Sequence, residues 1–244
     1  MKIVGLGDAL TLPFWRRSIA LLFMMALAMP IAFNKWAALL NNFVVEVAGF
    51  DGSDIGLLHA VREIPGFLAV GVIALIIFIR EQVLGLVSLV LLGVATGITA
   101  FFPSMGGILT LTMLSSIGFH YYETVNQSLQ LQWIEKARAP QMIGWLMAAG
   151  SAVTFVAYVL IVMTWQAFDL SYAFVYMVSG GATVVIALFC LFAYPQFEAQ
   201  HPQFKDVGAA PSVLAVLCAA IYGRCPPPDF CRVRRVHDGR EVRL

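Results

Sequence analysis

Charged residues are scarce in this chain of 244 residues: Asp, Glu, Lys and Arg together make up 12% of it, whereas hydrophobic residues make up 60%. A soluble domain carries about 25% charged residues. The mean hydropathy of +0.85 agrees with this bias. The composition excludes an ordinary soluble protein and predicts an all-α integral membrane protein, with the lipid bilayer as its main partner. The net charge of +1 gives no indication of nucleic-acid binding.

Motifs for metal binding and hydrolysis are also missing. The four cysteines form no Cys-x-x-Cys pair, and there is no His-Glu-x-x-His motif, no Gly-x-Ser-Gly motif and no pair of aspartates in facing spans. The spacing of Cys225, Cys231 and His237 fits no common metal site. We therefore expect no catalytic residue, no metal and no cofactor, and an intramembrane enzyme is the least favoured function.

Six hydrophobic segments are long enough to cross a bilayer, and short turns join them. The third contains many small residues and is expected to be a packing helix, and Gly144 and Gly150 are expected to allow close approach of the fifth. A leader, residues 1–17, precedes this six-span bundle of residues 18–195, and a tail, residues 196–244, follows it. The predicted spans are residues 18–47, 55–79, 83–102, 108–133, 141–165 and 171–194.

Basic and acidic residues alternate between successive loops. One set of loops is basic, and the other set carries only Asp51, Asp54 and Asp169. Because basic loops stay in the cytoplasm, both ends of the bundle are predicted to be cytoplasmic. The basic residues are Lys2, Arg16, Arg17, Arg80, Lys136 and Arg138.

A polar stripe interrupts the fourth span. At about 100° per residue its members fall within an arc of roughly 80°. Ionisable residues in a span usually face the bundle interior or a water-filled cavity. The stripe predicts a path for a substrate or ion, and the alternative is that it only hydrogen-bonds neighbouring helices. Its members are Ser116, His120, Glu123, Gln127 and Gln130.

Two further spans carry polar residues that are candidates for the same path. They are Asn34, Lys35 and Asn41 in the first span, and His59, Arg62 and Glu63 in the second. Because Arg62 and Glu63 are neighbours in sequence, they are not expected to face each other on a helix. Each is expected to find a partner on another helix, and an interhelical ion pair that only fixes the packing is the alternative role.

Several segments together resemble the N-terminal half of a major facilitator superfamily transporter, most closely a bacterial branch of permeases. The resemblance covers roughly residues 15–205, although Arg80-Glu81-Gln82 stands where the superfamily usually has a Gly and an Asp-Arg pair. The segments are Asp54-Ile-Gly-Leu-Leu58, Arg62-Glu-Ile-Pro-Gly66, Ser116-Ile-Gly-Phe-His-Tyr-Tyr-Glu123 and Gln132-Trp133.

The resemblance implies secondary active transport of a small solute across the bacterial inner membrane. It implies that the first, second, fourth and fifth spans line the path. It also implies that Glu123 or Glu63 could carry a coupling proton. The substrate, the direction of transport and the coupling ion do not follow from it.

The composition changes near the end of the chain. Residues 224–244 are dense in Arg, Pro and Cys. Back-translation in a shifted frame gives a string that resembles the seventh span of the same permeases. We therefore expect that a frameshift near residues 208–210 shortened a twelve-span transporter. The alternative is a genuine half-size protein that works as a parallel homodimer, either as a channel or as a transporter.

Overall fold

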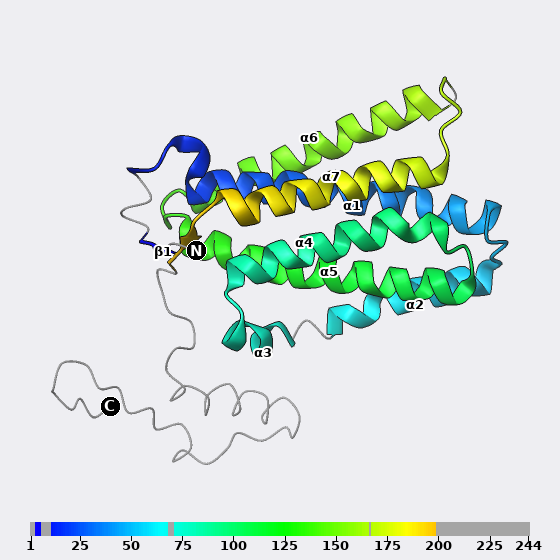
Figure 1. Ribbon diagram of the computed structural model, residues 1–244, viewed down its shortest axis with the longest axis horizontal. Coiled ribbons are helices and arrows are strands. Elements are labelled where there is room, and N and C mark those ends of the chain that lie inside the picture. The colour runs from blue at the N-terminus through cyan, green and yellow to red at the C-terminus, as the bar shows by residue number, and fades with distance from the viewer. Residues whose placement is uncertain (1–2, 6–10, 68–70, 166, 199–244) are drawn as a thin grey trace, which may run out of the picture. The chain divides into compact units, whose positions relative to one another are not determined.

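The computed structural model describes residues 3–5, 11–67, 71–165 and 167–198, which are mostly helical (Figure 1). Two short 3-10 helices, η2 (Phe14–Arg16) and η4 (Thr99–Phe101), flank longer ones, and strand β1 (Ile3–Val4) pairs in parallel with β2 (Gln196–Phe197). The α-helices in these residues are α1 Ser18–Glu46, α2 Gly52–Phe67, α3 Gly71–Phe78, α4 Glu81–Ile98, α5 Met105–Trp133, α6 Ala139–Trp165 and α7 Tyr172–Ala193.

Four helices are long and apolar enough to cross a membrane: α1, α4 extended by η4, α6 and α7. Together with the helical fold they indicate a membrane protein. α5 has 29 residues and coincides with the expected fourth span, but its polar stripe lowers its hydropathy. The expected second span, 55–79, holds two helices, α2 with 16 residues and α3 with 8. The six-span bundle therefore remains a prediction.

The long helices pack side by side (Figure 1). α4 packs between α5 and α7, α1 contacts α4, α5, α6 and α7, and α2 packs along α5. The main apolar core includes Leu21 and Met25 of α1, Leu89 of α4 and Val125 of α5, all fully buried. α4 is the most buried of the four candidate spans and α6 the least. In a bilayer this packing relies on close van der Waals contact, because lipid is as apolar as the core.

Glycines bring α4 and α7 into backbone contact. A Cβ on Gly93 of α4 would lie 2.7 Å from the carbonyl oxygen of Gly180 on α7, and a Cβ on Gly180 would lie 2.6 Å from the amide nitrogen of Gly97. These spaces admit no side chain. On the α5 side, a Cβ on Gly118 would lie 2.8 Å from the Ser88 carbonyl oxygen. The prediction that the third span is a packing helix is therefore confirmed.

The two glycines expected to bring α6 close to a neighbour differ. A Cβ on Gly150 would lie 3.2 Å from the carbonyl oxygen of Ala26, so α6 does approach α1 at this point. Nothing lies within 4 Å of the corresponding position on Gly144, and the prediction for that residue is wrong. The close contact between α6 and α1 is therefore made at Gly150, near the middle of α6.

Hydrogen bonds tie helix ends together at both ends of the bundle. At one end, Arg16 Nε donates to the Ala193 carbonyl at 3.0 Å, and Gln82 Nε2 donates to the Pro195 carbonyl at 2.9 Å. At the other end, the Tyr172 hydroxyl donates to Glu46 Oε2 at 2.6 Å. The start of α1, the start of α4 and the end of α7 therefore lie together. Which of these ends faces the cytoplasm remains a prediction.

A capping box starts α2. Asp51 Oδ1 accepts the backbone N–H groups of Ser53 at 2.8 Å and Asp54 at 3.0 Å, and Asp54 Oδ2 accepts the N–H of Asp51 at 3.1 Å. These bonds satisfy N–H groups that have no partner within the helix. Gly49, with φ of 70°, takes the left-handed conformation just before this start.

Several sequence-based predictions lie outside the described residues. They are the basic tail after residue 198, the change of reading frame near residue 209, and any metal site at Cys225, Cys231 and His237.

Candidate functional site

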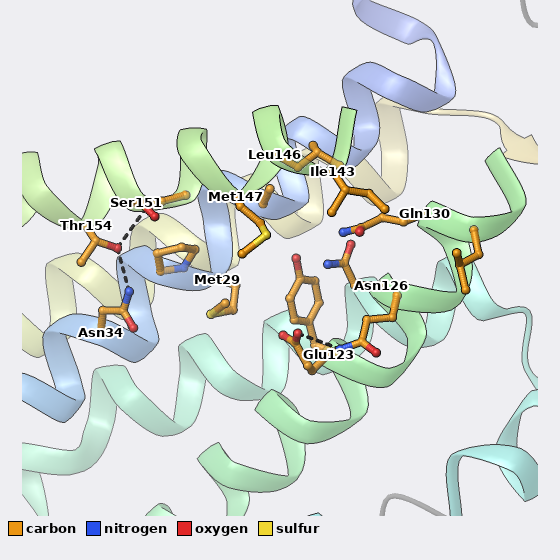
Figure 2. Close-up of a pocket in the computed structure, with 16 residues that line it drawn as sticks. Met29, Asn34, Glu123, Asn126, Gln130, Ile143, Leu146, Met147, Ser151 and Thr154 are labelled. Carbon is orange, nitrogen blue, oxygen red and sulfur yellow. Dashed lines mark hydrogen bonds between the residues drawn. The ribbon is translucent and has the colours of Figure 1, made fainter. Parts of the chain in front are cut away.

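A pocket of about 580 Å³ lies between α1, α5 and α6. Its walls combine polar groups with apolar side chains, and Figure 2 shows both kinds around the same space. These three helices correspond to the first, fourth and fifth predicted spans. The polar residues that line it are Asn34 of α1, then Glu123, Asn126, Gln127 and Gln130 of α5, and Ser151 and Thr154 of α6.

The polar wall comes from one long, regular helix. α5 starts at an N-cap, where Ser104 Oγ accepts the Gly107 N–H at 3.2 Å, and it continues to Trp133. Residues three, four and seven positions apart lie on one side of a helix. Glu123, Gln127 and Gln130 follow this spacing, and all three line the pocket. The second half of the predicted stripe therefore lines a cavity.

Glu123 is oriented by its neighbour one turn along. Gln127 Nε2 donates to Glu123 Oε1 at 3.1 Å, as the dashed line in Figure 2 shows. Because a carboxylate only accepts hydrogen bonds, this contact fixes which end of the Gln127 amide faces it. Glu123 takes part in neither of the two salt bridges found among the described residues.

Two further side chains of α5 that line the pocket, Tyr122 and Asn126, differ in how their polar atoms are satisfied. The Tyr122 hydroxyl is buried and donates to the Met25 carbonyl at 3.0 Å, which links α5 to α1. Asn126 is 8% exposed, and its Oδ1 has no hydrogen-bond partner among the described residues. A buried polar atom without a partner costs about 1–3 kcal/mol. Asn126 therefore places an unsatisfied acceptor in the wall of the pocket.

The opposite wall is held by a chain of hydrogen bonds between α1 and α6. Asn34 Nδ2 donates to Thr154 Oγ1 at 2.7 Å, and Thr154 Oγ1 donates to the Gly150 carbonyl at 3.0 Å. The Tyr158 hydroxyl donates to the Asn34 carbonyl at 3.0 Å. Asn34, which the sequence analysis named as a candidate, thus lines the pocket and also joins α1 to α6.

Ser116 and His120, the first two members of the stripe, pack against α2 instead of lining the pocket. Ser116 is buried, and its hydroxyl donates to the Arg62 carbonyl. The His120 imidazole lies beside Gly66, where an added Cβ would be 3.3 Å from its Cε1 atom. Ser116 thus bonds to a neighbouring helix, as the alternative interpretation expected, and His120 packs against the same helix.

Arg62 and Glu63 contradict the expectation for neighbours in sequence. Arg62 Nη2 lies 2.9 Å from Glu63 Oε1, and Arg62 Nε donates to the same oxygen at 3.0 Å. The idea that each finds a partner on another helix is therefore wrong. Both side chains are long enough to bend toward each other around the helix surface. The pair is partly exposed, with 29% and 58% of the two side chains accessible.

The remaining predicted residues also lie away from the pocket. Lys35 and His59 are half-buried and Asn41 is exposed, and none of the three lines the pocket. In the described part of the chain, no group of three or more His, Cys, Asp or Glu side chains lies close enough to hold a metal ion.

The sequence analysis did not name Asn126, Ser151 or Thr154 as residues of the path, although Gly150-Ser151 was expected to allow close approach of a neighbouring helix. Asn126 lies three residues after Glu123, so helical spacing alone could have indicated it. Ser151 and Thr154 are three residues apart next to Gly150, and a pair of hydroxyls beside a small residue is a signal for a helix interface. What the sequence does not reveal is that this face of α6 meets α5 across a cavity.

Comparisons of this chain with protein-family models, with curated proteins and with solved structures gave no match. The class of protein therefore follows from the structure alone. It is a helical chain with four helices that are long and apolar enough to cross a membrane, which indicates a membrane protein.

Proposed function

We propose that this chain is a secondary transporter, or the N-terminal half of one, in which the pocket between α1, α5 and α6 forms part of a path for a small solute across the bacterial inner membrane. One observation carries the proposal. A pocket of about 580 Å³, lined by a carboxylate and several amides, lies between α5 and two helices, α1 and α6, that are long and apolar enough to cross a membrane. Polar groups of this kind are costly in lipid and are usually retained for a substrate or ion.

The contrast with other polar side chains of α5 supports this interpretation. Glu81 Oε2 accepts from Ser128 Oγ at 2.9 Å and from Gln132 Nε2 at 2.7 Å, so these three side chains satisfy one another. Asn126, between them and Glu123 in sequence, keeps an unpartnered oxygen. Thr112 Oγ1 and Ser115 Oγ of α5 are also buried without a partner, but of these three residues only Asn126 lines the pocket.

The finer proposal is that the described helices correspond to one half of a major-facilitator-type permease. Three of the four spans expected to line its path contribute to the pocket. Within this scheme Glu123 is the better candidate to carry a coupling proton. Glu63 is exposed, is paired with Arg62 and does not line the pocket.

Flux through phospholipid vesicles that contain the full chain tests this proposal. Labelled amino acids, sugars, organic acids and organic amines are offered with and without an imposed pH gradient. We expect uptake of at least one solute that responds to the gradient, and we expect Glu123→Gln to abolish that response. The matched control is Glu135→Gln, because Glu135 is an exposed glutamate in the turn between α5 and α6.

Two results would contradict the proposal. The first is no flux of any solute through wild-type protein whose helical content is intact by circular dichroism. The second is a response to the pH gradient that is the same in Glu123→Gln as in the control, which would remove Glu123 from the coupling role.

A further inference from the structure

We infer that the ligand of this pocket is an organic cation, namely an amine with an apolar body. This inference rests on the proposed function and names the class of solute that the site takes. It is carried by three features of the lining: its charge, its surplus of hydrogen-bond acceptors, and its apolar surface.

The charge of the lining has one sign. Of the described residues that line the pocket, Glu123 alone carries a charge. The two basic residues that the sequence analysis proposed for the path do not line the pocket. They are Lys35, and Arg62, which is paired with Glu63. An anion in the pocket would meet a carboxylate and no countercharge, whereas an ammonium group would pair with Glu123.

The oxygens left without donors also favour a cation. Gln127 already occupies Glu123 Oε1, so Glu123 Oε2 remains for a ligand. Asn126 Oδ1 is buried in the wall of the pocket without a donor. Pro30 has no N–H to donate to the carbonyl of Ala26, and both residues line the pocket. An ammonium group supplies only donors, which are what these three oxygens lack.

The remaining lining suits a hydrocarbon body. Methionine side chains adapt to irregular apolar ligands, because they are flexible and polarisable. Aliphatic side chains complete this part of the pocket, and Figure 2 shows several of them facing the polar groups. A ligand with one charged end and one apolar end therefore fits both surfaces. The apolar lining residues are Met29, Leu131, Ile143, Leu146 and Met147.

Equilibrium binding to the purified full chain in detergent tests this inference, with three probes that share a ring and differ in charge. They are phenethylammonium, the neutral 2-phenylethanol and the anionic 3-phenylpropanoate. A charge-assisted hydrogen bond is worth more than a neutral one, so we expect the amine to bind at least ~10-fold more tightly than the alcohol. We expect no measurable binding of the carboxylate.

Two variants locate the effect. Glu123→Gln keeps the size of the side chain and is expected to reduce the affinity for phenethylammonium to that for 2-phenylethanol. Asn126→Leu is similar in volume, removes the unpartnered oxygen, and is expected to weaken amine binding more than alcohol binding. Glu135→Gln, outside the pocket, is expected to bind all three probes as the wild type does.

Equal affinity for the three probes, preference for the carboxylate, or absence of binding by all three would overturn the inference. So would a preference for the amine that survives in Glu123→Gln. Binding and flux separate this inference from the proposed function. Selective amine binding without flux refutes transport and leaves the cation site, whereas flux without charge preference refutes the cation site and leaves transport.

Discussion

The described glutamates show how neighbours decide the role of a single side chain. Glu81 is satisfied by two donors from α5, and Glu63 is paired with the adjacent Arg62 on an exposed face. Among the described residues Glu123 accepts a hydrogen bond from Gln127 of its own helix, and it lines a pocket. The same residue type thus packs helices, neutralises a surface charge and lines a candidate binding site. Only Glu123 of these three lines the pocket.

The cap of α2 gives a prediction about acid stability. The N–H of Asp54, the hydroxyl of Ser53 and the N–H of Ser53 all donate to Asp51 and hold its pKa below the usual 3.8. Because the folded pKa lies below the unfolded one, the stabilisation is fully present above the unfolded value and is lost as pH falls through the lowered folded value. We expect the melting temperature to decrease as the pH is lowered below about 4.

Asp51→Asn provides the control for this effect. Asn is also a good N-cap but carries no ionisable carboxyl group. Melting curves between pH 3 and pH 7 should show a shallower acid-induced decrease in the variant than in the wild type. Parallel profiles for the two proteins would show that Asp51 does not contribute to acid sensitivity.

Elements in this chain associate in two different ways. α4 and α7 meet through glycines with their backbones in contact, which leaves no room between them. α5 and α6 have few direct contacts and are separated by the pocket. The bundle thus combines a tight helix pair with an open one. Small residues at the tight contact are a general device for helix association in lipid.

Two adjacent glycines of α7 make the tight contact testable. A Cβ on Gly180 would overlap the backbone of α4, whereas nothing lies within 4 Å of a Cβ on Gly181. We expect Gly180→Ala to destabilise the protein by about 1–3 kcal/mol through overpacking. Gly181→Ala should be neutral or slightly stabilising, because alanine favours helix more than glycine does. Thermal unfolding in detergent measures both, and equal midpoints would contradict the close contact.

At the scale of the whole molecule, the path of residues 52–78 decides the number of membrane crossings. Four helices are long and apolar enough to cross, while α2 and α3 divide the expected second span between them. Arg16 and Arg80 lie where α1 and α4 start and α7 ends, whereas the turn that contains Asp51 follows the other end of α1. The predicted topology requires Asp51 and Arg80 to lie on opposite sides of the membrane.

Accessibility tags inserted beside Asp51, Arg80, Lys136 and Asp169 test this topology in intact cells. We expect labelling by an impermeant reagent beside Asp51 and Asp169, which are predicted to face outward. We expect protection beside Arg80 and Lys136. Labelling of Arg80 and Asp51 from the same side would show that α2 and α3 together do not cross the membrane.

Sequence alone located most of the helices, because membrane-spanning helices are contiguous apolar runs. Five expected spans correspond to α1, α4, α5, α6 and α7 with ends shifted by a few residues. In the expected second span the structure describes α2 as far as Phe67 and α3 from Gly71, and residues 68–70 lie outside the described residues. Hydropathy measures preference for lipid and does not report where a helix starts and ends within such a run.

The candidate site could be predicted only in part. Helical spacing placed Glu123, Gln127 and Gln130 on one face, and they do line one pocket. The same spacing could not distinguish them from Ser116, whose hydroxyl bonds to the backbone of α2. That distinction depends on which helix packs against each turn of α5. The Arg62–Glu63 pair was missed because helix periodicity describes Cβ directions and not the reach of long side chains.

The glycine contact between α4 and α7 also limits how this sequence can change over generations. Every replacement of Gly93 or Gly180 adds atoms where the two backbones already touch, so no larger residue fits at either position. Apolar side chains of the pocket such as Met147 are under no such limit, because a cavity admits both larger and smaller residues. Substitutions that survive should therefore collect around the pocket and be rare at this contact. A lineage of such proteins could then acquire new ligands while keeping the same helix pair unchanged.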